Sequence, residues 1–206
     1  MRIISPGHVI LFMQNGEDIL KQIETAGRTC YKSEDKITAD SAAGFVKRII
    51  KSGHHSVIEH INVSVRFVCD RGISHEIVRH RLAAYSQEST RYANYSKDKF
   101  GNEITVIKPY FWPENSEEYL VWKQAMQNAE QSYLKLLKNG ARPEQARSVL
   151  PNSLKTEIVM TCNLREWRHV LKLRCSKASH PQIRELMLPL LDEMRAKLPV
   201  LFDDLV

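Results

Sequence analysis

The spacing of hydrophobic and polar positions changes along the chain, and these changes predict a succession of helices and strands. Apolar residues at intervals of three and four predict amphipathic helices, whereas strict alternation predicts strands with one buried face. Helices are predicted for residues 17–31, 38–52, 116–139, 164–175 and 181–197. Strands are predicted for residues 7–14, 61–69, 103–108 and 154–162. We expect an α/β fold of the α+β type, with a mostly antiparallel sheet flanked by helices.

Residues that start or stop helices sharpen these boundaries. Thr38 can cap the second helix, and Gly53 ends it as a C-terminal glycine. Asn163 is a good N-cap, and Glu166 three residues later completes a capping-box pattern. Pro189 is expected to interrupt the last helix, because proline removes a helical hydrogen bond.

Residues 73–92 combine a helical pattern with a polar segment that follows it directly. The apolar stripe consists of Ile73, Ile77, Val78, Leu82, Ala84 and Tyr85. It predicts a helix that carries Arg79, His80 and Arg81, and residues 85–92, rich in hydroxyl and amide groups, predict a loop. Two arginines and a histidine beside such a loop suit an anionic small molecule. Arginines on a helix are also common on a solvated face, and that reading stays open here.

The helix predicted for residues 164–175 places one arginine apart from its polar face. The packing row consists of Leu164, Trp167, Val170 and Leu171. The polar face consists of Arg165, Arg168, His169 and Lys172. Arg174 lies one turn beyond Leu171, where it either interacts with the helix dipole or reaches into a cleft. The pattern alone favours the dipole.

Residues 53–60 contain His54, His55, Glu59 and His60, a combination that could ligate a metal. Their spacing matches no common zinc motif, and no second ligand cluster is visible in the sequence. We therefore expect a loop of hydrogen-bonding groups and no bound metal.

Length and composition indicate an ordinary globular protein. A chain of 206 residues can bury a core without disulfides, and we expect residues 1–206 to form one domain. The scattered cysteines form no C-x-x-C pair and are expected to be buried thiols. No apolar run is long enough to cross a bilayer, and the first residues lack a signal-peptide pattern. We expect a cytoplasmic protein with no membrane partner.

The net charge of +6 indicates an anionic ligand. Basic residues are spread among acidic ones without a basic tail or block, so a small phosphorylated ligand fits this charge as well as nucleic acid does. One alternative is a nucleic-acid-binding module that uses Arg79, Arg81, Arg91, Arg165, Arg168 and Lys172. A second alternative is a metallohydrolase built on His54, His55 and His60.

Four separated segments resemble the flavin-dependent thymidylate synthase family, in the same order along the chain. The most specific is Arg79-His80-Arg81 with Ser89 after seven intervening residues and Arg91-Tyr92 just beyond. The others are Gly53-His54 with Glu59-His60, the Ala-Arg-x-Val-Leu-Pro segment at residues 146–151, and Asn163-x-Arg165 with Arg174.

The resemblance implies an enzyme that methylates dUMP to dTMP with methylenetetrahydrofolate as carbon donor. NADPH would reduce a bound FAD, and the flavin would deliver the hydride. The chain has no G-x-G-x-x-G, so a Rossmann crevice is not expected. The resemblance also implies a homotetramer with active sites shared between subunits and no nucleic-acid partner.

The resemblance further assigns roles to individual residues. Arg174 would be catalytic, holding the uracil edge so that C5 becomes nucleophilic. The implied FAD-binding residues are His54, Ser56, Arg79, His80, Arg81, Gln87, Asn163, Leu164, Arg165 and His169. The implied dUMP-binding residues are Glu76, Ile77, Val78, Arg79, Gln87, Glu88, Ser89, Thr90, Arg91, Arg147 and Arg174. Three residues depart from those common in the family: Gln87 replaces Glu, His169 replaces Asn, and Glu76 replaces Gln.

Overall fold

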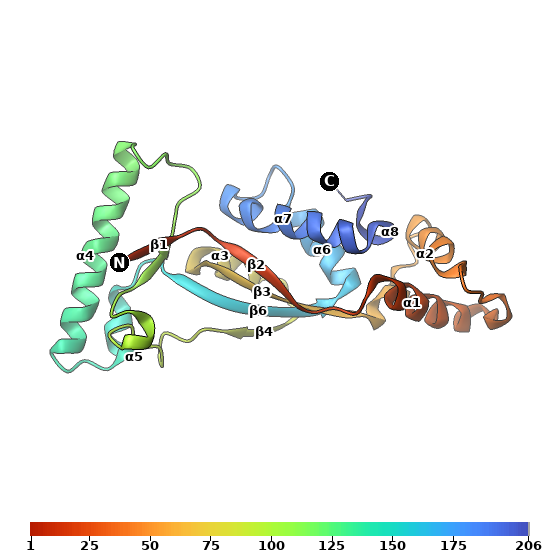
Figure 1. Cartoon of the computed structure of the whole chain (residues 1–206), viewed down its shortest axis with the longest axis horizontal. Coiled ribbons are helices and arrows are strands. Elements are labelled where there is room, and N and C mark those ends of the chain that lie inside the picture. Colours follow the sequence, from red (N-terminus) through yellow and green to blue (C-terminus); the bar gives the residue numbers. More distant parts are fainter. Residues whose placement is uncertain (206) are drawn as a thin grey trace. The chain divides into compact units, whose positions relative to one another are not determined.

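Two long strands lie at the centre of the main sheet in the computed structural model, which describes residues 1–205 (Figure 1). β3 (Asn62–Asp70) and β6 (Lys155–Asn163) are neighbours, with β2 (Gly7–Phe12) beside β3 and β4 (Ala84–Gln87) beside β6. This four-stranded sheet is antiparallel. A second sheet pairs β1 (Arg2–Ile4) with β5 (Thr105–Ile107) in parallel. The predicted α+β class is confirmed.

The helices follow most of the predicted segments. They are α1 (Gly16–Tyr31), α2 (Ser41–Lys51), α3 (Arg71–Ile77), α4 (Glu117–Lys138), α5 (Pro143–Ala146), α6 (Leu164–Arg174), α7 (Pro181–Lys197) and α8 (Pro199–Phe202). Short 3-10 helices span Glu34–Lys36, His55–His60, Asp98–Phe100 and Arg147–Val149. Within residues 1–205, no helix has both the length and the apolar character that crossing a bilayer requires.

Two predicted helix features are wrong. α2 begins at Ser41 and Thr38 does not cap it, because the Ser41 hydroxyl accepts the Thr38 amide at 2.9 Å in a turn that precedes the helix. The same hydroxyl donates to the carboxylate of Glu24 at 2.7 Å. α7 continues through Pro189 without interruption. Its neighbour Leu190 is fully buried, so packing compensates for the missing hydrogen bond.

Contacts within the chain define two compact units. The first comprises residues 1–8, 67–79 and 85–159, and the second comprises residues 9–66, 80–84 and 160 to the end of the described chain. In the first unit, α4 contributes buried aromatic residues to the core, as its stripe predicted. These residues are Tyr119, Trp122 and Tyr133. A single domain of residues 1–206 stays a prediction.

Three of the four cysteines are buried, and Cys30 is exposed, contrary to the expectation of buried thiols throughout. Burial raises the pKa of Cys69 to about 12 and that of Cys175 to about 11. Burial also raises the pKa of Cys162. The buried thiols are therefore protonated at neutral pH and poor nucleophiles.

Arg168 joins α6 to the end of the chain. Its guanidinium donates to the two carboxylate oxygens of Asp204, at 2.7 Å and 2.6 Å, and Nη1 also donates to the carbonyl of Leu201. The side chain is buried, unlike the exposed Arg165 and Lys172 with which it was assigned to one polar face. Bidentate pairing explains how α6 accommodates a buried arginine.

Asp204→Asn should lower the free energy of unfolding at pH 7 by about 1 kcal/mol, since the carboxylate is half-exposed and its ion pair is screened by water. The hydrogen bond from Arg168 holds the pKa of Asp204 below its usual value. A lowered carboxyl pKa stabilises the fold above the unfolded pKa of about 3.9, and that stabilisation is lost as pH falls through the folded pKa. Urea titrations should therefore show a difference at pH 7 that shrinks below about pH 3.9.

Asp203→Asn is the matched control, because Asp203 is exposed beside Asp204, and it should leave stability unchanged. A wild-type minus Asp204→Asn difference that stays constant from pH 7 to acid would contradict the assigned ion pair.

Candidate functional site

The Arg79-His80-Arg81 segment follows α3 and does not lie on it. The Asp70 side chain caps the start of α3 by accepting the Ile73 amide at 2.6 Å. The Tyr85 hydroxyl donates to the Ile77 carbonyl at 2.8 Å at the helix end. The predicted continuation of this helix is wrong, because residues 84–87 form β4 beside β6 and strand pairing overrides the helical period.

The predicted apolar stripe is only partly buried for the same reason. Ile73 and Ile77 lie in the core, but Val78 and Leu82 are 37% and 76% exposed. The first three residues of the predicted loop of residues 85–92 also belong to a strand. Of the arginine-histidine-arginine triplet, the arginines are exposed and the histidine is buried.

His80 lies among polar side chains of α6. Its Nε2 accepts a hydrogen bond from Arg174 Nε at 2.9 Å, and its Nδ1 lies 3.6 Å from Glu166 Oε1. The ring of His169 stands edge-on to His80, with centroids 5.9 Å apart. Burial, followed by the charges of Arg174 and His169, lowers the pKa of His80 to about 4. His80 is therefore neutral at physiological pH.

The start of α6 fixes these side chains. Asn163 caps the helix by accepting the Glu166 amide at 2.9 Å, as predicted. Trp167 is fully buried and donates its Nε1–H to the carbonyl of Val63 in β3 at 3.0 Å. The Glu166 carboxylate, assigned to a capping box by the sequence pattern, instead lies beside His80. Anchored on one side, α6 presents its other side to an adjoining cavity.

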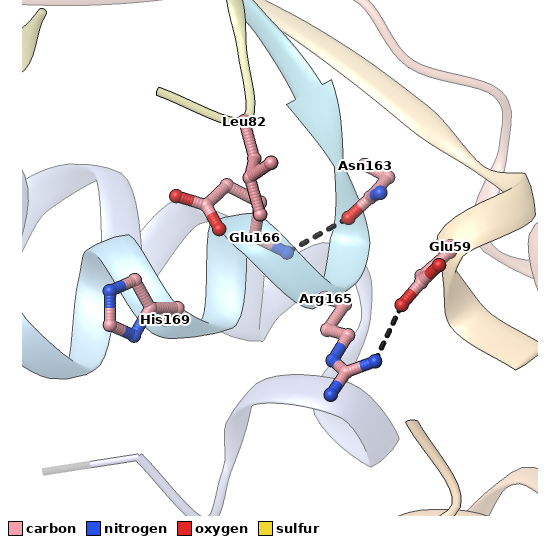
Figure 2. Close-up of a pocket in the computed structure, with 6 residues that line it drawn as sticks. All are labelled: Glu59, Leu82, Asn163, Arg165, Glu166 and His169. Carbon is pink, nitrogen blue, oxygen red and sulfur yellow. Dashed lines mark hydrogen bonds and ion pairs between the residues drawn. The ribbon is translucent and has the colours of Figure 1, made fainter. Parts of the chain in front are cut away.

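A cavity of about 780 Å³ lies along the start of α6 (Figure 2). Its lining residues are Glu59, Leu82, Asn163, Arg165, Glu166 and His169. Arg165 Nη1 lies 2.6 Å from Glu59 Oε1, and both side chains are partly exposed. An exposed ion pair contributes little to stability, so an anionic ligand can exchange for the Glu59 carboxylate at low cost. The volume and the mixture of donors suit a large polar cofactor with apolar parts.

His54 and Ser56 line a second cavity of about 370 Å³ together with Arg165. Ser56 lies in a 3-10 helix, His55–His60, and His54 is the N-cap of that helix, so this segment is not the predicted loop. Burial of Val57 and Ile58 explains this order, because a compact turn places both apolar side chains inward. Arg165 is common to both cavities.

The remaining residues that are predicted to bind the cofactor differ in how exposed they are. Arg79 and Arg81 are exposed. Leu164 is fully buried, and its backbone N–H donates to the carbonyl of Ile61 at 3.0 Å. Within residues 1–205, the side chains with metal-type ligand atoms within 4.8 Å of one another are His80, Glu166 and His169, which differ from the histidines of residues 53–60.

The first unit contains a second group of predicted residues around the end of β4. Gln87 donates to the hydroxyls of Ser74 and Thr156, at 2.9 Å and 3.2 Å. Thr90 is buried, and its hydroxyl lies 3.5 Å from Arg147 Nη1. Segments far apart in sequence therefore meet here, as the predicted role of Arg147 requires.

Glu88 is held by partners that the sequence did not indicate. Its carboxylate accepts from the Tyr95 hydroxyl at 3.0 Å and from Lys155 Nζ at 3.1 Å. Ser89 Oγ accepts the Arg91 amide at 3.3 Å, and the Arg91 guanidinium lies over the ring of Tyr92. These contacts restrain residues 88–91, all of which are predicted to bind dUMP.

Sequence reasoning missed three residues of the larger cavity. Leu82 was assigned to a core stripe, Glu59 to a hydrogen-bonding loop and Glu166 to a cap. No local sequence pattern shows that these residues line a cavity, because the cavity forms between segments that are far apart in the chain. The Glu59–Arg165 pair joins residues separated by 106 positions.

Comparison with known proteins gives one consistent result. Residues 11–200 match the family described as thymidylate synthase complementing protein. The chain is 33% identical over 202 residues to the flavin-dependent thymidylate synthase of Geobacter sulfurreducens, covering 95% of this chain and 85% of the relative. It is 35% identical over 164 residues to the protein of the same name from Pyrococcus abyssi, covering 79% and 66%. For the Mycobacterium tuberculosis relative of that name, identity is 34% over 200 residues, covering 88% and 78%.

Proposed function

This chain belongs to the thymidylate synthase complementing protein family, and from that membership we propose that it is the enzyme that forms dTMP from dUMP with a bound flavin. In this reaction, methylenetetrahydrofolate donates a one-carbon unit to C5 of dUMP, and the C5 proton leaves. A hydride then completes the methyl group, and NADPH supplies the reducing equivalents. The products are dTMP, tetrahydrofolate and NADP⁺, so atoms and electrons balance.

The observation that carries this proposal is the 780 Å³ cavity, which is lined by three of the predicted FAD-binding residues. Asn163 and His169 offer hydrogen-bonding groups, and Arg165 offers a positive charge for a pyrophosphate. Leu82 supplies an exposed apolar side chain to the same lining. These groups match a ligand that has phosphates, ring polar atoms and a flat apolar surface. When bound, FAD supplies the hydride transfer that amino-acid side chains cannot perform.

Further residues are proposed to hold FAD from the family resemblance. They are His54, Ser56, Arg79, His80, Arg81, Gln87 and Leu164. The residues proposed to hold dUMP are Glu76, Ile77, Val78, Arg79, Gln87, Glu88, Ser89, Thr90, Arg91 and Arg147. The buried Thr90 beside Arg147 supports the last part of this assignment.

Arg174 is proposed as the catalytic residue. A permanently charged guanidinium at the uracil edge stabilises the anion-like form of the base, which makes C5 more nucleophilic. The hydrogen bond to His80 supports this role, because a cation stabilises a transition state well only when it is already oriented.

The family resemblance also leads us to propose a homotetramer with shared active sites and a cytoplasmic location. Sharing would let a chain of 206 residues serve three large ligands. Sedimentation or light scattering would measure the assembly directly, and a monomer with full activity would exclude shared sites.

The visible absorption spectrum of the purified protein tests the flavin part of the proposal. We expect flavin bands that bleach when NADPH is added anaerobically in the presence of dUMP. A protein that gains no flavin bands after FAD is added and the excess removed would overturn it. Tight, salt-sensitive binding to polynucleotide by such a colourless protein would favour the nucleic-acid-binding module.

Arg147→Ala should raise the KM for dUMP roughly 10- to 100-fold with a smaller change in kcat, because it removes a charge-assisted contact made in both ground and transition states. Steady-state kinetics with varied dUMP measures this effect. The matched control is Arg142→Ala on the adjoining exposed turn, where the arginine pairs only at the surface with Glu144. Equal effects of the two substitutions would refute a specific role for Arg147.

A further inference from the structure

Glu166 has no part in any ligand-binding or catalytic assignment made from the sequence, yet it is one of the few buried acidic side chains of the second unit. It is 7% exposed and lies on the first turn of α6. Burial raises the pKa of its carboxyl group, which shows that its charge has lost water. A buried carboxylate usually has a nearby group that interacts with its charge. The group beside Glu166 is the imidazole of His80.

The hydrogen bond from Arg174 determines which nitrogen of His80 carries the proton. An arginine Nε–H can only donate, so Nε2 of His80 must be the acceptor and must be unprotonated. A neutral imidazole with an unprotonated Nε2 carries its proton on Nδ1. That nitrogen faces the Glu166 carboxylate at 3.6 Å, a distance longer than a hydrogen bond, and the carboxylate charge attracts the N–H dipole at this nitrogen.

The three side chains thus interact in series: Glu166 determines the tautomer of His80, and His80 determines the orientation of Arg174. The negative charge of Glu166 favours the proton on Nδ1, and this tautomer leaves Nε2 ready to accept from Arg174. Because Nε lies in the plane of the guanidinium, this bond restrains the orientation of that plane. We propose that Glu166 is a positioning residue that acts through His80 to orient Arg174 for catalysis. The proposal rests on the proposed function of Arg174.

The same side chains could be read as a metal site, since His80, Glu166 and His169 offer ligand atoms within 4.8 Å of one another. The hydrogen-bond geometry argues against that reading. A metal needs an unprotonated nitrogen, but Nε2 of His80 is occupied by Arg174 and Nδ1 carries the proton. Both nitrogens of His80 are therefore accounted for without a bound metal.

The first test is the tautomer of His80, measured by long-range ¹H–¹⁵N correlation spectra of the full-length protein labelled on histidine. We expect a protonated Nδ1 and an unprotonated Nε2, the less common neutral form. A proton on Nε2 would overturn the proposal, and this result requires no variant. Retention of Zn²⁺ by the purified protein, with a metal-shifted His80 signal, would also overturn it.

The second test is kinetic. Glu166→Ala should lower kcat for dTMP formation roughly 10- to 100-fold, as loss of a supporting partner commonly does, while the flavin spectrum is retained. Glu166→Gln keeps the size of the side chain and an acceptor oxygen but loses the charge, so it should restore only part of the activity. Glu193→Ala, a half-exposed glutamate on α7, is the control and should have no effect.

The outcomes separate the two proposals. A wild-type protein that forms no dTMP refutes the proposed function. A wild-type protein that is active, with Glu166→Ala equally active, refutes only the positioning role. If Glu166→Ala does not fold, the tautomer of wild-type His80 still decides the question.

Discussion

Arg174→Ala should lower the rate of dTMP formation by a factor of about 100 to 1,000 or more while leaving FAD bound, the magnitude typical of removing one fixed group that stabilises a developing charge. The cavity proposed to hold FAD is lined by other residues of α6 and its surroundings, so the cofactor should remain. Single-turnover measurement of dTMP, with the flavin spectrum recorded on the same sample, separates chemistry from cofactor loss.

Arg174→Lys should be almost as inactive, because a lysine ammonium cannot donate from a planar fork to His80 and to a substrate at once. Lys177→Ala, an exposed cation three residues further on, is the matched control and should be fully active. Near-normal turnover by Arg174→Ala would refute the catalytic assignment even if the protein proves to be a flavoenzyme.

Trp167→Ala should lower the free energy of unfolding by about 3 to 5 kcal/mol, the cost expected when a large, fully buried aromatic side chain leaves a cavity. Trp167 has no exposed surface and its Nε1–H donates to the carbonyl of Val63. The loss should loosen α6, the helix that presents Asn163, Arg165 and Arg174. Chemical denaturation of the flavin-free protein measures the effect without a contribution from ligand binding.

Trp167→Phe keeps most of the packing and removes the indole hydrogen bond, so a smaller loss of about 1 to 2 kcal/mol is expected. Phe12→Ala is the comparison at the surface, since Phe12 is 72% exposed, and it should change stability little. Similar losses for Trp167→Ala and Phe12→Ala would mean that α6 is not anchored as the structure indicates.

Local patterns predicted the parts of the fold that local chemistry determines. The alternation in residues 61–69 gives β3, and the long amphipathic stripe of residues 116–139 gives α4. The Asn163 cap and the terminal Gly53, with φ of +72°, lie where their backbone chemistry requires them. In these places propensity, pattern and packing agree.

The segment after α3 shows where local pattern fails. Its apolar residues continue at helical spacing past Ile77, but β4 beside β6 places residues 84–87 in the sheet. Pairing with a strand more than sixty residues away in sequence decides the outcome, and no local pattern encodes it. The motif was thus recognised correctly, while its placement on a helix was wrong.

The site was predictable as a set of residues but not as a set of contacts. The resemblance named His80, Arg174 and Arg165 from their motifs. No sequence pattern indicated that His80 is buried, that Arg174 donates to it, or that Glu166 lies against its other nitrogen. The hydrogen bond between Arg174 and His80 joins residues that are 94 positions apart, so it forms only in the folded chain.

The most direct test of the account is to identify both products of the purified, FAD-loaded protein with dUMP, methylenetetrahydrofolate and NADPH under anaerobic conditions. If flavin carries the hydride, the folate loses only its one-carbon unit, so we predict dTMP together with tetrahydrofolate and a requirement for FAD. Absence of dTMP, or dTMP formed without FAD and accompanied by dihydrofolate, would contradict the proposed function.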